Sequence, residues 1–165
     1  MSDAPDKTSR HFTVVVRRDI DRPPDALFAA WTDPAVRRAV IAPEGSDWHL
    51  VEADIRDGGV EVIQHRPADQ PGTTVTRRYA ALRPPRLIVA QSVSAIDTGP
   101  RSPHSVVAAQ ELLLFKPTAA GAELVASSQV VSVQPNHVRA VEDAWNRKFD
   151  RFEDELEPQP RETGR

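Results

Sequence analysis

In several segments of the chain hydrophobic residues alternate with polar residues, and this period of two is typical of β-strands with one buried face. Residues 11–20 are predicted to form a strand for another reason, because they are rich in β-branched residues. From residue 48 onward the alternating pattern occurs in segments 48–55, 60–66, 73–82, 86–94, 105–115 and 122–132. Short turns rich in glycine, proline and aspartate separate these segments, so the pattern predicts an antiparallel meander.

Two short helices are predicted between the first strand and the second. Pro24 suits the first turn of a helix that ends near residue 32. Asp33 can then act as an N-cap, with Pro34 at the first helical position, which predicts a second helix over residues 35–41. This helix should end before Pro43, because proline disfavours helical geometry in the residue that precedes it.

A long amphipathic helix is predicted over residues 136–157, with Asn136 as its N-cap and Pro158 after its end. Steps of three and four residues separate its hydrophobic positions, which are Val138, Val141, Trp145, Phe149, Phe152 and Leu156. This spacing places them along one helical face. A strongly curved sheet cannot contact a straight helix along its whole length. We therefore expect a cavity beneath Trp145 and Phe149.

Length and composition indicate one globular domain. The polar ends, residues 1–10 and 158–165, are predicted to be flexible tails around a single domain at 11–157. With 21 Lys and Arg against 24 Asp and Glu, the formal charge of −3 argues against a general nucleic-acid-binding protein. The lack of cysteine excludes thiolate chemistry and is consistent with the cytoplasm. Neither a signal peptide nor a membrane-inserted segment is predicted.

Four stretches resemble the helix-grip (START-like, SRPBCC) superfamily and, within it, the group named for the activator of Hsp90 ATPase homologue 1 (AHSA1-like). They are PPDALFAAWTDP at 23–34, DIRDGG at 54–59, LRPPRLIV at 82–89 and Asp143-Ala144-Trp145 in the last helix. The resemblance implies an α+β helix-grip fold of the START and Bet v 1 type, with a curved antiparallel sheet of about seven strands, two short helices and one long C-terminal helix. The chain departs from the family pattern at residues 39–41, where tryptophan is common, and at Ala144, where glycine is usual.

The DIRDGG segment could form an anion cradle, a metal loop or a turn. Adjacent glycines between two strands are typical of a tight hairpin turn, because glycine adopts positive φ without a steric clash. A phosphate cradle would require a helix after the glycines, and a calcium loop would require more oxygen ligands at alternate positions. We therefore predict a turn, stiffened by pairing of Asp54 with Arg56.

Strand alternation, aligned with the family pattern, predicts which side chains face the cavity. Glu61, Ile63 and His65 share one face of their strand. With later strands and the helices included, the predicted ligand-binding residues are Trp31, Glu61, Ile63, Tyr79, Gln91, Glu111, Ser128, Trp145 and Phe149. A register error of one residue would turn such strand side chains to the opposite face.

Three functions remain open at this level. The fold and the aromatic stripe favour binding of a small hydrophobic or amphipathic molecule in the cavity. A polyketide cyclase-like, aromatase-like or hydrolase-like enzyme is the alternative, in which Glu61 with a raised pKa would act as a general base unless a cation such as Arg77 pairs with it. The family name also suggests a co-chaperone-type interaction with an Hsp90-type chaperone. No catalytic motif is present, no cofactor is predicted, and the histidines lack metal-binding spacing, so no metal site is predicted.

Overall fold

The computed structural model describes residues 9–96, 106–132 and 137–157. The predictions made for Asn136, for Pro158 and for the C-terminal tail fall outside these ranges. The elements, in chain order, are β1 (Arg10–Ile20), α1 (Pro24–Thr32), α2 (Pro34–Ile41), β2 (Trp48–Ala53), β3 (Val60–His65), β4 (Thr73–Arg83), β5 (Leu87–Ile96), β6 (Val106–Pro117), β7 (Ala122–Ser132) and α3 (His137–Leu156).

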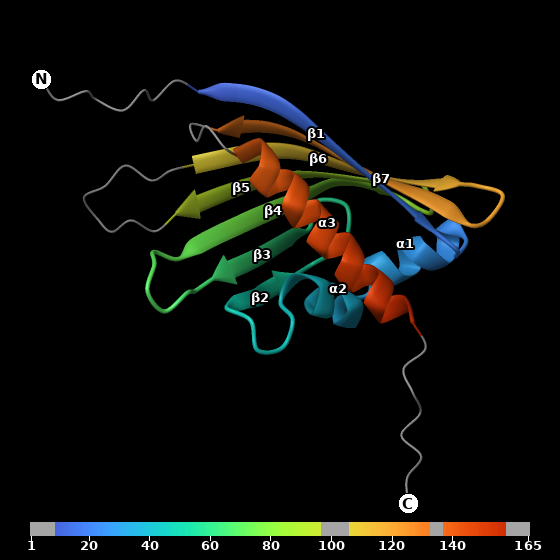
Figure 1. Cartoon of the computed structure of the whole chain (residues 1–165), viewed down its shortest axis with the longest axis horizontal. Helices are drawn as coiled ribbons and strands as arrows, with labels where there is room; N and C mark the ends of the chain where they lie inside the picture. The colour runs from blue at the N-terminus through green and yellow to red at the C-terminus, as the bar shows by residue number, and fades with distance from the viewer. Residues whose placement is uncertain (1–8, 97–105, 133–136, 158–165) are drawn as a thin grey trace, which may run out of the picture.

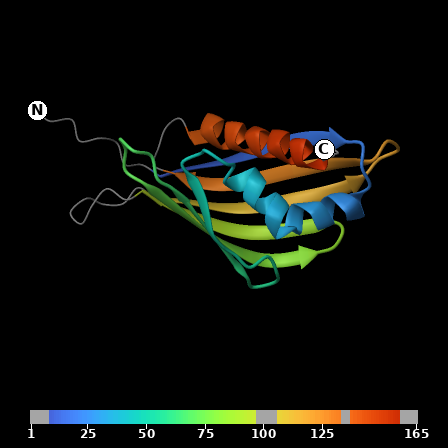
Figure 2. The ribbon, with the colours of Figure 1, turned by 90° about the horizontal axis from the view of Figure 1, so that it is seen from below.

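The strands form one seven-stranded antiparallel sheet with the order β1-β7-β6-β5-β4-β3-β2. Strands 2 to 7 form the predicted meander, and β1 joins it beside β7, so α1 and α2 connect the two edges of the sheet. The sheet is curved, and α3 runs across its concave face while α1 and α2 lie toward one end (Figures 1 and 2). The predicted helix-grip architecture is confirmed.

Local sequence signals account for the start of α2 and for the turn after β2. The carboxylate of Asp33 accepts hydrogen bonds from the backbone N–H groups of Ala35 and Val36 at 2.8 and 3.1 Å, which is the expected N-cap. In the turn, Gly58 has φ of 77°, and a Cβ on Gly59 would lie only 2.0 Å from the carbonyl oxygen of Asp54. The DIRDGG segment is therefore a turn that requires both glycines.

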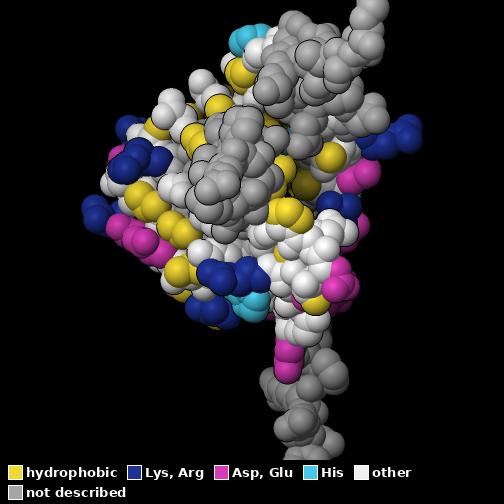
Figure 3. Space-filling model, turned by 90° about the vertical axis from the view of Figure 1, so that its left-hand side faces the viewer, with side chains coloured by type: hydrophobic (Ala, Val, Ile, Leu, Met, Phe, Trp, Pro, Cys, Tyr) yellow, Lys and Arg dark blue, Asp and Glu magenta, His cyan; other side chains and the backbone are white. Residues whose placement is uncertain are grey.

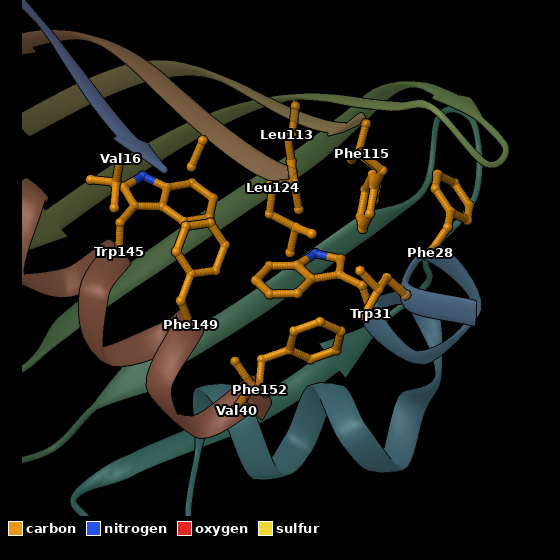
Figure 4. Close-up of a cluster of buried hydrophobic side chains, with 14 of the residues drawn as sticks. Val16, Phe28, Trp31, Val40, Leu113, Phe115, Leu124, Trp145, Phe149 and Phe152 are labelled. Atoms are coloured by element: carbon orange, nitrogen blue, oxygen red, sulfur yellow. The ribbon is translucent and has the colours of Figure 1, made fainter. Parts of the chain in front are cut away.

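The main core fills the space between the sheet and the three helices (Figure 4). Trp31 reaches from α1 to α3, where its ring meets the edge of Phe152 at a centroid distance of 4.9 Å. Phe149 and Phe152 are fully buried, as the helical spacing predicts. Val138 is 44% exposed, because the hydrophobic face of α3 packs against the core only from Val141 onward. In the described part of the chain, no helix is long and apolar enough to span a bilayer.

Candidate functional site

A cavity of about 380 Å³ lies between the concave face of the sheet and α3. Its apolar wall includes Trp48, Ile63, Val75, Val107, Val130 and Trp145. The ends of β5 and the starts of β4, β6 and α3 contribute to it, so the cavity lies toward the left of the molecule in Figure 1. Hydrophobic side chains are visible at that end, surrounded by charged side chains of both signs (Figure 3). Volumes of this order are usual for small-molecule sites.

Beside the cavity, Glu61 lies in a buried ionic network. Arg37 of α2 binds this carboxylate with two hydrogen bonds, from Nε to Oε2 at 2.7 Å and from Nη2 to Oε1 at 2.9 Å. Arg77 of β4 donates to Oε1 from Nη1, and the Tyr79 hydroxyl donates to Oε2 at 3.1 Å. Both guanidinium groups and the carboxylate are almost fully inaccessible to solvent. The network therefore ties α2 to β3 and β4 inside the core.

Arg77 continues the network to Glu111 of β6. Its Nε donates to Oε2 of Glu111 at 2.9 Å, and the Ser92 hydroxyl donates to Oε1 at 3.0 Å. Arg77, Glu111 and Ser92 line the cavity, whereas Glu61 and Arg37 lie behind it. The polar part of the cavity wall is thus held in place by hydrogen bonds from three strands.

The environment of Glu61 lowers its pKa well below the ordinary range. Burial by itself would raise the pKa, but the charges of Arg37 and then Arg77, together with their hydrogen bonds, favour the ionised form more strongly. The prediction of a raised pKa at Glu61 was therefore wrong, and the alternative of pairing with Arg77 is what the structure contains. A carboxylate held ionised by two guanidinium groups is a poor general base near neutral pH.

Lys148 of α3 also lines the cavity and is partly buried. Its ammonium group lies 4.3 Å from the centroid of the Trp145 ring, an attractive cation–π arrangement. Burial first, and then the nearby positive charge of Arg77, lowers the pKa of Lys148 to about 8. In the described ranges, no carboxylate forms an ion pair with it.

Ser128 and Trp145 are joined across the cavity wall. The indole Nε1–H of Trp145 donates to the Ser128 hydroxyl oxygen at 2.8 Å. Both residues are buried. They line the cavity together with Ile63 and Glu111. These residues are the part of the predicted site that the structure places on the cavity wall.

Other predicted site residues lie elsewhere. Trp31, Phe149, Tyr79 and Glu61 are buried in the core and do not line the main cavity. His65, predicted on the inward face, stacks on Trp48 at a ring distance of 4.4 Å and is also absent from the cavity wall.

The prediction that Gln91 faces inward was wrong. Gln91 is exposed and borders a groove on the opposite face of the sheet. Directly paired residues of neighbouring strands point to the same face, and Gln91 pairs with the exposed residues Arg78 and Gln110. The neighbouring Ser92, opposite the buried Arg77, faces the cavity instead.

Arg37 and Lys148 were not predicted as site residues from the sequence. A buried carboxylate at Glu61 requires a cationic partner, but the sequence contains several basic residues that could have paired with it. Lys148 follows Trp145 by three positions, a spacing that places side chains on neighbouring parts of one helical face. The described ranges hold no group of three His, Cys, Asp or Glu side chains that could bind a metal ion.

Comparison with known proteins identifies one family and several similar structures. The family described as "Activator of Hsp90 ATPase homolog 1-like protein" matches residues 21–157. A protein from Rhizobium leguminosarum is 22% identical with a TM-score of 0.76, and the match covers 91% of this chain and 98% of that one. No curated protein matches the sequence.

Two further structures share the fold at lower identity. The AHSA1-like protein from Aeromonas hydrophila is 17% identical with a TM-score of 0.60, over 88% of this chain and 92% of that one. DynU16, a protein of the dynemicin biosynthetic locus, is also 17% identical with a TM-score of 0.61, over 87% of this chain but 46% of that longer chain. At these identities the likeness concerns the fold alone.

Proposed function

The chain belongs to the activator of Hsp90 ATPase homolog 1-like family, and on this premise we propose that it binds a small hydrophobic or amphipathic molecule between the sheet and α3. The observation that carries the proposal is the cavity of about 380 Å³, with an apolar wall and a few converging polar groups. This combination is characteristic of small-molecule sites. The polar groups include Glu111 and Ser92, which would orient a ligand, while Trp48 and Trp145 would contact its apolar part.

The inward face of β5 supports this proposal over a purely structural space. Ser92 and Ser94 face the cavity, while Val93 between them is 46% exposed on the outer face. A strand that only served the core would be expected to place its valines inward and its serines outward. In β5 the order is reversed, so the cavity wall gains two hydroxyl groups while the valine between them stays out of the core.

The enzyme alternative stays a prediction from related folds, but Glu61 is no longer its candidate general base, because it is fully buried between two arginines that lower its pKa. A co-chaperone-type interaction stays a prediction suggested by the family name alone. A pull-down with an Hsp90-type chaperone would test that interaction separately.

A fluorescent probe can test the proposed binding. N-phenyl-1-naphthylamine is uncharged, and its emission rises in an apolar environment, so the wild-type protein should bind it saturably. Ser94→Phe would place a large ring in the cavity and should weaken probe binding at least about ten-fold. Val93→Phe is the matched control, because the adjacent side chain lies on the outer face. Absence of saturable binding, or equal loss in both variants, would contradict the proposal.

A further inference from the structure

We propose that the molecule bound in this cavity carries one anionic group of the carboxylate class and that Lys148 binds that group. This inference rests on the proposed function and narrows its ligand to acidic amphiphiles. Three observations carry it: the charge balance of the buried network, the charge of the cavity wall and the hydrogen-bonding state of Ser128.

The buried network is balanced without Lys148. Two guanidinium groups, of Arg37 and Arg77, face two carboxylates, of Glu61 and Glu111. Each carboxylate already accepts from Arg77, and each also accepts from a second group, Arg37 or Ser92. Lys148 thus adds a positive charge that forms no ion pair in the described ranges, and Glu111 and Glu61 attract it only over a longer distance. A partly buried ammonium without a direct counter-charge is costly, and an anion beside it would reduce that cost.

The cavity wall as a whole is cationic, although the chain is acidic. Arg77 and Glu111 on the wall offset each other, and Arg147, Lys148 and Arg151 line it in addition. The whole chain has a formal charge of −3. A concave apolar surface that gathers one sign of charge attracts ligands of the opposite sign.

Ser128 offers a hydrogen-bond donor beside Lys148. Its hydroxyl oxygen accepts from the indole of Trp145, and in the described ranges its own O–H has no acceptor. Ser128 is 1% exposed and lines the cavity. The Lys148 ammonium lies against the same indole, so a carboxylate near this ring could accept from both groups.

The pH dependence of binding follows from the surroundings of Lys148. The charged groups that act on it are Arg77 of β4, Glu111 of β6, Arg37 of α2 and Glu61 of β3. On α3, Arg147 and Arg151 also line the cavity, as does His137 at the start of the helix. With the pKa of free Lys148 at about 8, the anion-binding ammonium form is lost as the pH rises above that value. Carboxylate affinity should therefore fall between about pH 7 and pH 9.5.

The test compares decanoate with decan-1-ol, two ligands that differ in their polar group, by displacement of N-phenyl-1-naphthylamine from the whole protein. Wild type should prefer decanoate at least about ten-fold at pH 7. Lys148→Met should reduce this preference to within about two-fold and leave decan-1-ol binding unchanged, and Lys148→Arg should retain most of it. Lys116→Met makes the same substitution on β6, where Lys116 is exposed and does not line the cavity, and should behave as wild type.

The possible outcomes separate this inference from the proposed function. Equal binding of decanoate and decan-1-ol by wild type would overturn the inference and leave the binding function intact. A loss of both ligands in Lys148→Met, with the same loss in Lys148→Arg, would assign the lysine a structural role and overturn it as well. If the probe itself does not bind wild type, both proposals fail. Retention of the preference at pH 9.5 would also contradict a role for the Lys148 ammonium.

Discussion

Arg77 donates a hydrogen bond to Glu61, its direct partner in the β3–β4 pair. The same guanidinium also binds Glu111 of β6, so one side chain joins the core behind the cavity to the cavity wall itself. Because Arg37 brings α2 to the same carboxylate, the position of the helix depends on this network. The shape of the proposed site and the stability of the fold are therefore coupled.

Removal of the Glu61 carboxylate should destabilise the protein strongly. Glu61→Ala would leave Arg37 and Arg77 buried without their shared counter-charge, and breaking a buried pair in this way typically costs about 3–5 kcal/mol. Urea unfolding followed by circular dichroism measures the change. Asp54→Ala is the control, because it removes an exposed pair with Arg56 and should cost less than about 1 kcal/mol. Similar losses of unfolding free energy in the two variants would show that the buried network stabilises the fold no more than the exposed pair does.

Because of this network, the free energy of unfolding should also depend on pH in the acidic range. Burial by itself would raise the pKa of Glu111, but the charges of Arg77 and Lys148, together with hydrogen bonds from Arg77 and Ser92, lower it to about 2. A carboxyl group with a folded-state pKa below its unfolded value of about 4.3 stabilises the fold above that pH and loses its contribution as the pH falls toward the folded value. The Glu61 pKa is shifted in the same direction.

Unfolding free energy measured between about pH 7 and pH 3 should therefore fall less steeply in Glu111→Gln than in wild type. The control Glu123→Gln removes a carboxylate on the surface, where Arg17 and Lys116 pair with it, and should change the slope little. An unchanged slope in Glu111→Gln would contradict the depressed pKa.

Phe152 should contribute to stability without shaping the cavity. It is fully buried against Trp31 and does not line the cavity. Phe152→Ala should cost about 3–5 kcal/mol in thermal or urea unfolding, while probe affinity of the folded protein stays close to wild type. Val138→Ala, at an exposed position of the same helix, should lie within about 0.5 kcal/mol of wild type. A ten-fold loss of probe affinity in Phe152→Ala would mean that Phe152 also shapes the cavity.

The two glycines of the DIRDGG turn should respond differently to alanine. At Gly58 the added Cβ meets open space, so the cost is that of a left-handed backbone conformation, about 1–2 kcal/mol. At Gly59 the added Cβ would lie 2.0 Å from a backbone oxygen, so the turn itself must move and the loss should be larger. Urea unfolding of both variants gives the comparison. A smaller loss for Gly59→Ala than for Gly58→Ala would contradict the described turn.

Much of the fold could be predicted from the sequence because its signals are local. The cap at Asp33, the glycines after β2 and the helical spacing from Val141 to Phe152 each determine the structure of a short segment. The resemblance to a known family then supplied the arrangement of these segments. For this reason the predicted boundaries differ from the observed ones by only a few residues.

The site was less predictable because it depends on register and on contacts between distant segments. On β5, Ser92 and Ser94 face inward, so the usual rule that hydrophobic side chains mark the buried face leads to the wrong face and to Gln91. The partner of Glu61 on α2, Arg37, lies 24 residues away and next to the similar Arg38, and no local pattern distinguishes the two. Such a pairing depends on how the helix and the sheet pack together in the folded core.

The most direct test of binding in the cavity uses the three tryptophan indole N–H signals in a ¹H–¹⁵N correlation spectrum. Trp48 and Trp145 line the cavity, whereas Trp31 lies in the core behind it. Titration with decanoate should shift the signals of Trp48 and Trp145 saturably and move that of Trp31 less, while the side-chain amide of Gln91 on the outer face stays in place. Shifts confined to Gln91 and its neighbours, or no saturable shift of Trp48 and Trp145, would contradict the proposed site.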